Sequence, residues 1–325
     1  MQRLLRACFV AATIGGIVTG IDAALAQGSA AGYPSKPVSV VLPLSPGGVV
    51  DAEARLLTAK LQASMGQPFV LDFRPGAGQT IGIVFTHKAA PDGYTFMMAN
   101  SGITITPNFY PALSHQAVSQ LVPITELTQS LNGLLISTTA LPNVRSLKDL
   151  VAYGKANPGT LNCGTTGGGG QTHMVCAGLA NAMGIAILPV HYKGSAAVMT
   201  DLRAGRIQMF SGGLSRLSSD LRMIAILRST RSPSLPDLPT SFEQGYEVDS
   251  PNWLGAFAPP NTPAAITNKL HSELVKALKS PEVVAALDKM EFNAVGSTSE
   301  EFRKRIAGEL AYWKKIIEDN KIRLE

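Results

Sequence analysis

The chain has 325 residues, of which 45% are hydrophobic and 16% charged, and its formal net charge is +5. This length provides for about two domains with ample cores. Lysine and arginine form no dense run and no stripe with interleaved aromatic residues, so no nucleic-acid partner is expected. A mildly positive field suits an anionic small molecule, although ordinary surface composition is the simpler explanation of the charge.

The N-terminus has the pattern of a secretory signal peptide. Arg3 and Arg6 precede an apolar stretch at residues 7–18, and the small residues at 24–26 predict cleavage after about Ala26. Glycines and Asp22 interrupt this stretch before it reaches the roughly 20 apolar residues that a membrane anchor needs. We therefore expect residues 1–26 to be removed and the mature protein to be periplasmic. Loss of Arg3, Arg6 and Asp22 changes the net charge from +5 to +4.

Cys163 and Cys176 are the cysteines of the mature chain. They fit either one disulfide in an oxidising compartment or two buried small hydrophobic residues, one at a strand end and one in the following helix. Their spacing is far from Cys-x-x-Cys, and histidine and cysteine form no cluster with metal-ligand spacing. We expect neither a metal nor a cofactor.

Short β-branched runs alternate with amphipathic stretches in the first part of the chain. Strands are predicted at residues 38–42, 68–73 and 94–99, and helices at residues 52–65 and 80–90. This strand-helix-strand order predicts a parallel, doubly wound α/β sheet. Ligands bind beyond the carboxyl ends of the strands in such sheets.

A second α/β unit follows. It contains predicted strands at 134–136, 187–191 and 207–210 and predicted helices at 146–156 and 196–204.

The C-terminal segment has the sequence Thr298-Ser299-Glu300-Glu301, a capping box that opens a long helix with one apolar stripe. We expect this helix to pack back on the first domain. The predicted organisation is a first domain of residues 33–129 and 254–325 and a second domain of residues 130–253, with chain crossings near 129–133 and 251–254.

Two glycine-rich loops each follow a predicted strand and precede a predicted helix. They are Pro43-Leu44-Ser45-Pro46-Gly47-Gly48-Val49-Val50-Asp51 and Gly164-Thr165-Thr166-Gly167-Gly168-Gly169-Gly170-Gln171-Thr172-His173. Missing side chains let a ligand approach the backbone, and the N–H groups and dipole of a helix N-terminus favour an anion. Two such loops that face each other would form an anion clamp.

Several motifs occur in the order and at the intervals typical of one family. They are Tyr33-Pro34-Ser35-Lys36-Pro37, the first glycine loop, Arg74-Pro75-Gly76-Ala77-Gly78, Ala90-Pro91-Asp92-Gly93-Tyr94, Tyr192-Lys193-Gly194-Ser195, Leu235-Pro236-Asp237-Leu238-Pro239-Thr240 and Ala258-Pro259-Pro260-Asn261-Thr262-Pro263. The chain resembles the Bug family of extracytoplasmic solute receptors of tripartite tricarboxylate transporters. The likeness covers essentially the whole mature chain.

The resemblance implies a two-domain periplasmic-binding-protein fold, or flytrap, with the ligand enclosed between two α/β domains. In that family, the loops that match residues 43–51 and 165–173 grip a ligand carboxylate, partly through ordered waters. The expected ligand-binding residues lie in these loops and after neighbouring strands. They are Leu44, Ser45, Pro46, Gly47, Gly48, Asp51, Gly78, Asn100, Ser101, Thr165, Thr166, Gly167, Gly169, Gln171, His173, Tyr192, Lys193 and Ser211.

The chain departs from the family pattern at three places. Val49-Val50 and Gly170-Gln171 stand where the family has hydroxyl side chains. Ser211-Gly212-Gly213 replaces a Phe-Asp-Asn pattern, so an acidic partner for a ligand ammonium is absent there, which argues against amino acids as ligands. The pocket is therefore expected to be atypical.

Several of these residues also have a structural interpretation. Asp51 in a first helical turn stabilises the helix dipole, His173 orders a turn, and Arg74 forms a salt bridge that holds a turn. Lys193 follows a strand on the cleft side and has a stronger case for binding. A nucleotide P-loop is disfavoured because Gln171 stands where that motif requires lysine.

Two other functional classes remain open. Ser101, His173 and Asp201 could be combined into a hydrolytic triad, but Gly-x-Ser-x-Gly is missing, and we expect no catalysis. A ligand-dependent sensor that presents its closed form to a membrane signalling protein has the same residues as a transport receptor. The favoured prediction is a monomeric periplasmic receptor that binds a small organic carboxylate and delivers it to membrane permease subunits.

Overall fold

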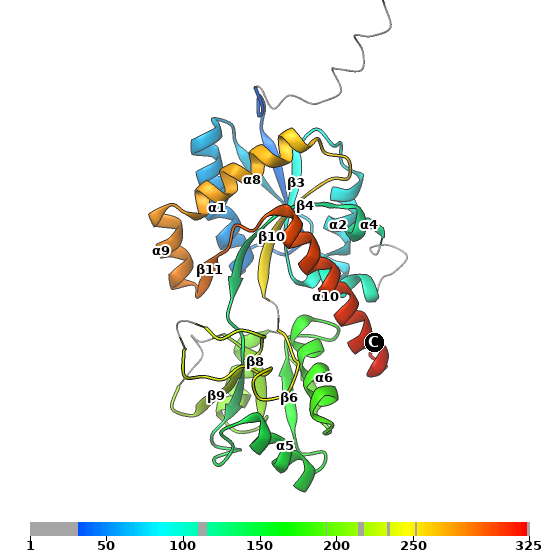
Figure 1. The fold of residues 1–325 in the computed structure, drawn as a ribbon, viewed down its shortest axis with the longest axis vertical. Helices are drawn as coiled ribbons and strands as arrows, with labels where there is room; N and C mark the ends of the chain where they lie inside the picture. The colour runs from blue at the N-terminus through cyan, green and yellow to red at the C-terminus, as the bar shows by residue number, and fades with distance from the viewer. Residues whose placement is uncertain are drawn as a thin grey trace, which may run out of the picture.

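The computed structural model describes residues 32–109, 116–192, 194–213, 218–232, 235–250 and 252–323. It has two domains, each built on its own sheet (Figure 1). Among these residues, every helix is too short or too polar to cross a membrane. The α/β two-domain fold expected from the sequence is confirmed.

The first sheet has six strands in the order β11-β4-β10-β3-β1-β2. Its strands are β1 (Val38–Leu42), β2 (Phe69–Phe73), β3 (Thr95–Asn100), β4 (Val122–Ser130), β10 (Trp253–Ala258) and β11 (Phe292–Ala294). The helices of this domain are α1 (Val49–Met65), α2 (Thr80–Lys88), α3 (Gly102–Ile105), α4 (Gln116–Gln120), α8 (Ala264–Leu278) and α9 (Pro281–Lys289), with 3-10 turns η1 (Ala77–Gln79) and η2 (Thr106–Asn108).

The second sheet has five strands in the order β7-β6-β8-β5-β9. Its strands are β5 (Gly133–Ser137), β6 (Asn162–Thr165), β7 (Leu188–His191), β8 (Met209–Gly212) and β9 (Leu221–Ile226). The helices of this domain are α5 (Leu147–Ala156), α6 (Gln171–Met183) and α7 (Ser195–Arg203). Cys163 at β6 and Cys176 in α6 form a disulfide, which resolves the alternatives left open by the sequence.

Each sheet is mixed rather than wholly parallel. β1 pairs in parallel with β2 and β3, as the strand-helix-strand order predicts, but β10 pairs antiparallel with β3 and β4. In the second sheet β5 pairs antiparallel with β8 and β9. β10 returns from the other domain without a crossover helix, so its direction is free of the rule that makes βαβ strands parallel.

The chain crosses between the sheets along two adjacent segments. The side-chain amide of Asn132 donates to Ser250 Oγ at 3.2 Å, and the backbone N–H of Ser130 donates to Asn252 O at 2.8 Å. These bonds tie the segment that leaves the first sheet after β4 to the segment that returns before β10.

The long helix α10 (Ser299–Asp319) begins at the predicted capping box, in which Thr298 N–H donates to Glu301 Oε2 at 2.9 Å. Phe302 packs on Trp253 of the first domain, whereas Trp313 belongs to the core of the second domain with Leu179. The N-terminal half of this helix packs back on the first domain as expected, whereas its C-terminal half packs on the second domain (Figure 1). An apolar stripe identifies the buried face of a helix but not what covers it.

Candidate functional site

The first glycine loop connects β1 to α1 and is held in place by the side chain of Asp51. Gly47 has φ +88° and donates its N–H to Asp51 Oδ2 at 2.8 Å, and Asp51 also pairs with Arg55 at 2.7 Å. Gly48 is the N-cap, and within the described structure no side chain caps this helix end. The first-turn N–H groups of α1 are therefore left for a ligand or water.

The second glycine loop connects β6 to α6 in a similar way. Gly169 has φ +71° and donates its N–H to His173 Nδ1 at 3.0 Å, while Thr166 N–H donates to Thr172 Oγ1 at 2.9 Å. Gly170 is the N-cap, and no side chain in the part of the chain that is described caps α6. Burial, with a smaller contribution from the neighbouring His191, lowers the pKa of His173, so a neutral ring accepts the loop N–H near neutral pH.

A cavity of about 1250 Å³ lies between the domains and is lined by both helix starts. Predicted residues that line it are Leu44, Ser45, Pro46, Gly47, Gly48, Asp51, Asn100, Thr166, Gln171 and Ser211. An adjoining cavity of about 640 Å³ shares part of this lining and adds Gly78 and Gly169. The two glycine loops thus meet at one cleft.

Asn100 is the polar side chain at the end of β3. Its Oδ1 accepts from Gln79 Nε2 at 2.6 Å and from Gly102 N–H at 3.1 Å. These two bonds fix which way the amide faces, so its NH₂ group is the donor available to the cavity.

Other predicted residues lie outside these linings. Ser101 and Thr165 are buried, and Gly167 and His173 belong to the second loop without lining the cavities. The Tyr192 hydroxyl donates to Asp201 Oδ2 at 2.9 Å. Lys193 lies outside the described residues. The binding role of each predicted site residue stays a prediction.

The cavity is also lined by residues that the sequence did not predict as ligand-binding. Gly194 and Ser195, at the start of α7, bring a third helix N-terminus to the cleft. Both residues belong to the motif at residues 192–195, from which the sequence predicts only the tyrosine and the lysine as ligand-binding residues. Asn132, Asn252, Glu53 and Glu291 also line the cavity, and only the pairing of distant segments brings them there.

The side chains of the hypothetical hydrolytic triad have other partners. Asp201 binds the Tyr192 hydroxyl and pairs with Arg206 at 2.7 Å, which together hold its pKa below the usual value. His173 Nδ1 is occupied by the loop N–H, and Ser101 is buried. Within the described ranges, no three His, Cys, Asp or Glu side chains are grouped to hold a metal ion.

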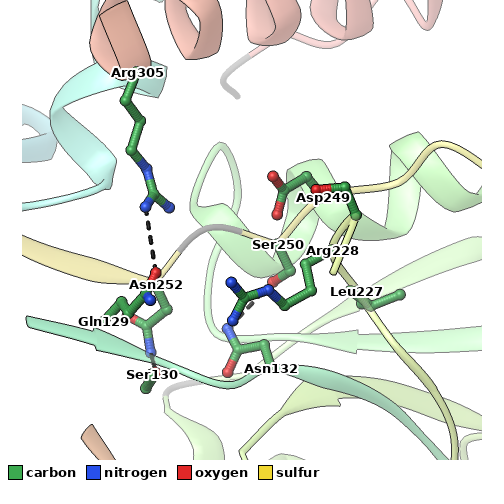
Figure 2. A pocket seen from close by; sticks show the side chains of 10 residues that line it. Gln129, Ser130, Asn132, Leu227, Arg228, Asp249, Ser250, Asn252 and Arg305 are labelled. Atoms are coloured by element: carbon green, nitrogen blue, oxygen red, sulfur yellow. Dashed lines mark hydrogen bonds between the residues drawn. The ribbon is translucent and has the colours of Figure 1, made fainter. Parts of the chain in front are cut away.

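A smaller cavity of about 270 Å³ lies at the chain crossings (Figure 2). Figure 2 shows Arg305 of α10 extending toward Gln129, which it contacts at 3.4 Å, with Arg228 and Asp249 on other walls. Arg305 also pairs with Glu126 at 2.7 Å and with Glu309 at 2.9 Å. A small cavity with polar walls therefore lies at the junction of the two domains.

Comparisons with known proteins agree with this architecture. Bordetella pertussis BugT is 33% identical over 306 residues, which cover 91% of this chain and 93% of BugT. A solved periplasmic transporter shares 32% identity, with a TM-score of 0.73 over 90% of this chain and 100% of that one. R. palustris Rpa4515, solved with adipate, shares 28% identity, with a TM-score of 0.73 over 90% and 99%.

A further structural neighbour is the periplasmic binding protein BugD, at 25% identity and a TM-score of 0.71 over 90% of this chain and 100% of that one. The model of the tripartite tricarboxylate transporter family receptor matches residues 53–322. The cleft with two uncapped helix starts lies within a fold and a sequence pattern that this chain shares with these relatives along nearly its whole length. This protein therefore belongs to the receptor family of the tripartite tricarboxylate transporters.

Proposed function

We propose that this protein is a periplasmic receptor that binds a small organic carboxylate between its two domains and delivers it to a tripartite tricarboxylate-type membrane transporter. The observation that carries the proposal is the meeting of the α1 and α6 N-termini at one cleft, both without side-chain caps in the described structure. Helix N-termini favour anions through their N–H groups and dipoles. Adipate in the relative Rpa4515 supports the carboxylate class.

The proposed domains are residues 33–129 with 254–325 and residues 130–253, with the end of α10 resting on the second domain. A ligand that touches both domains stabilises a closed state, and the membrane permease subunits recognise that state. A ligand-dependent sensor is the alternative, since it uses the same cleft and the same closure. Transport of the bound ligand in cells that carry the receptor and permease genes, and its loss without the receptor, distinguishes the two.

The cleft is tested with valine substitutions at glycines that tolerate a side chain. Gly48 and Gly168 both line the cleft, neither has a positive φ, and a Cβ at either meets nothing within 4 Å. Gly48→Val and Gly168→Val should fold normally and weaken carboxylate binding at least tenfold in calorimetry, because the side chain blocks approach to the N–H groups. Gly169→Val is unsuitable, because Gly169 has φ +71° and the variant would be strained without any ligand.

Gly308→Val is the matched control. It lies in α10, where a Cβ also meets nothing within 4 Å, and it does not line the cleft. Its binding should equal that of the parent protein. Unchanged affinity in folded Gly48→Val and Gly168→Val would contradict the placement of the site. Chemical turnover of the ligand by the purified protein would contradict the receptor function itself.

A further inference from the structure

Gln79 is a polar side chain that is buried beside the cleft in an uncommon backbone conformation. It lies at the end of η1 with φ +81°, and its exposed fraction is 7%. A positive φ is rare for a residue with a Cβ and is found most often at ligand sites and switches. Gln79 lines the cavity of about 640 Å³, yet its Oε1 has no hydrogen-bond partner among the described residues. A buried acceptor without a partner is rare in folded proteins.

The amide of Gln79 is held in place by Asn100 and Gly102. Gln79 Nε2 donates to Asn100 Oδ1 at 2.6 Å, and the Gly102 N–H donates to the same oxygen at 3.1 Å. A Cβ at Gly102 would lie 2.2 Å from Gln79 Nε2, so the missing side chain leaves the room that this amide occupies. Because the Gly102 N–H is a donor, it identifies the oxygen of the Asn100 amide, and that oxygen identifies the nitrogen of Gln79. Gln79 Oε1 and the Asn100 NH₂ group therefore remain for a ligand.

The described lining of the 640 Å³ cavity consists of uncharged residues. Its polar side chains are Ser45, Gln79, Asn100, Thr106, Thr166 and Gln171. Gly170, the N-cap of α6, lines the same cavity. An ionised group that entered the cavity beyond this helix start would lose its water without gaining a counter-ion from the described lining, which is costly. The part of a ligand that lies beside Gln79 and Asn100 is therefore expected to be polar and uncharged.

We propose that Gln79 and Asn100 form an amide-binding subsite for a carboxamide group of the ligand. The Asn100 NH₂ donates to the carbonyl oxygen of this carboxamide, and Gln79 Oε1 accepts from its N–H. This inference rests on the proposed function and narrows its ligand class to carboxylates that also carry a neutral carboxamide. The carboxylate of the same ligand lies at the N-terminus of α6. A carboxamide has one acceptor and one donor in a fixed planar group, so it satisfies both side chains at once.

Other ligand groups satisfy only part of this pair. A ketone accepts from Asn100 but leaves Gln79 Oε1 without a partner, and an ammonium group donates to Gln79 but accepts nothing from Asn100. A second carboxylate also accepts from Asn100, but it places a negative charge beside the partially negative Gln79 Oε1. Gln79 is thus a specificity-determining residue that favours a neutral group with both a donor and an acceptor.

Calorimetry with matched acids tests the amide-binding subsite. The probes are the half-amides of linear dicarboxylic acids of four to six carbons. Each half-amide is compared with its methyl ketone, in which CH₃ replaces NH₂, and with its parent dicarboxylate. At least one half-amide should bind about tenfold more tightly than its ketone and its dicarboxylate, because the ketone leaves a buried acceptor without a partner.

Two variants of Gln79 should each reduce the ratio of half-amide to ketone affinity to about one. Gln79→Met keeps the length of the side chain and removes its amide. Gln79→Gly removes the side chain and suits the positive φ, so it keeps the test decisive if Gln79→Met does not fold. Asn261→Gly is the matched control, because Asn261 has φ +64° and lies outside the described lining of the three cavities. It should leave the ratio unchanged, and thermal unfolding checks that each variant folds.

The outcomes separate the subsite from the receptor function. Equal binding of the half-amides and their ketones, or tightest binding by a dicarboxylate, would overturn the amide-binding subsite and leave the receptor function standing. An unchanged ratio in folded Gln79→Gly would overturn the role of Gln79. Failure of every probe and of a wider carboxylate screen to bind would overturn the receptor function as well.

Discussion

At the scale of single residues, charged and polar side chains near the cleft hold the loops in place. Asp51 and His173 each accept an N–H from a glycine of the loop that precedes them. Arg74 pairs with Asp72 at 2.8 Å and lies 3.5 Å over the Phe85 ring, as expected for a side chain that holds a turn. The loop N–H groups that these side chains occupy are not available to a ligand in this conformation.

The Glu53 carboxyl makes the stability of the protein depend on pH. Its pKa is raised to about 7 in the folded state, so the folded chain holds the proton more tightly than the unfolded chain. Its contribution to stability is complete below the unfolded value of 4.5 and is lost as pH rises through about 7. Between pH 5 and pH 8 the parent protein should therefore lose about 3 kcal/mol more stability than Glu53→Gln. Urea unfolding at several pH values measures this, and parallel curves would contradict it.

At the scale of secondary-structure elements, α10 depends on close approach to β10. Gly255 of β10 has no side chain, and a Cβ there would lie 2.2 Å from Cζ of Phe302. The rings of Trp253 and Phe302 have centroids 5.1 Å apart in a T-shaped arrangement. A glycine inside a strand often marks such a contact. The close approach of Phe302 to β10 thus depends on the missing side chain at Gly255.

Gly255→Ala should destabilise the protein by roughly 1–3 kcal/mol, because the added methyl group overpacks against Phe302. In the double variant Gly255→Ala/Phe302→Leu the smaller side chain makes room for the methyl group, so the loss should be less than the sum of the two single losses. A double-mutant cycle of unfolding free energies measures the coupling. Additive losses would show that the ring does not limit the space at Gly255.

At the scale of the whole molecule, the cleft, the crossings and α10 together constrain closure. The 1250 Å³ cavity exceeds the roughly 300–1000 Å³ of typical ligand pockets, as expected for an open form. The hydrogen bonds between the two crossing segments favour a rotation of the domains relative to each other about the axis along which these segments lie. Because α10 packs on both domains, closure also requires its contact with α6 to shift or α10 to move with the second domain.

Saturation with a bound carboxylate should reduce the radius of gyration in small-angle scattering, since closure brings the domains together. Hydrogen exchange should slow at residues 47–51 and 165–173 together, because one ligand touches both loops. Gly308→Val should behave like the parent protein, and Gly48→Val should show neither change at the same ligand concentration. Protection of only one loop would contradict the two-loop clamp.

Much of the fold could be predicted because it depends on local patterns. The alternation of β-branched runs and amphipathic stretches predicts β1, β2, β3, β5, β7 and β8 to within a few residues, although it predicts no strand at β4, β9, β10 or β11. The capping box identifies Thr298 as the N-cap of α10. The glycine loops could be located because Gly47 and Gly169 adopt positive φ, which few other residues tolerate. The family could also be identified, since several spaced motifs together are specific where each alone is not.

Other features depend on contacts between distant segments and are decided only by the tertiary structure. The direction of β10, the partner of the C-terminal half of α10, and the presence of Glu53 and Glu291 at one cavity all require segments far apart in sequence to meet. Hydrophobic periodicity reports which face of an element is buried but not which surface covers it. The sequence by itself determined many of the elements, the two glycine loops and the family of this protein, whereas the tertiary structure decided which side chains share its cleft.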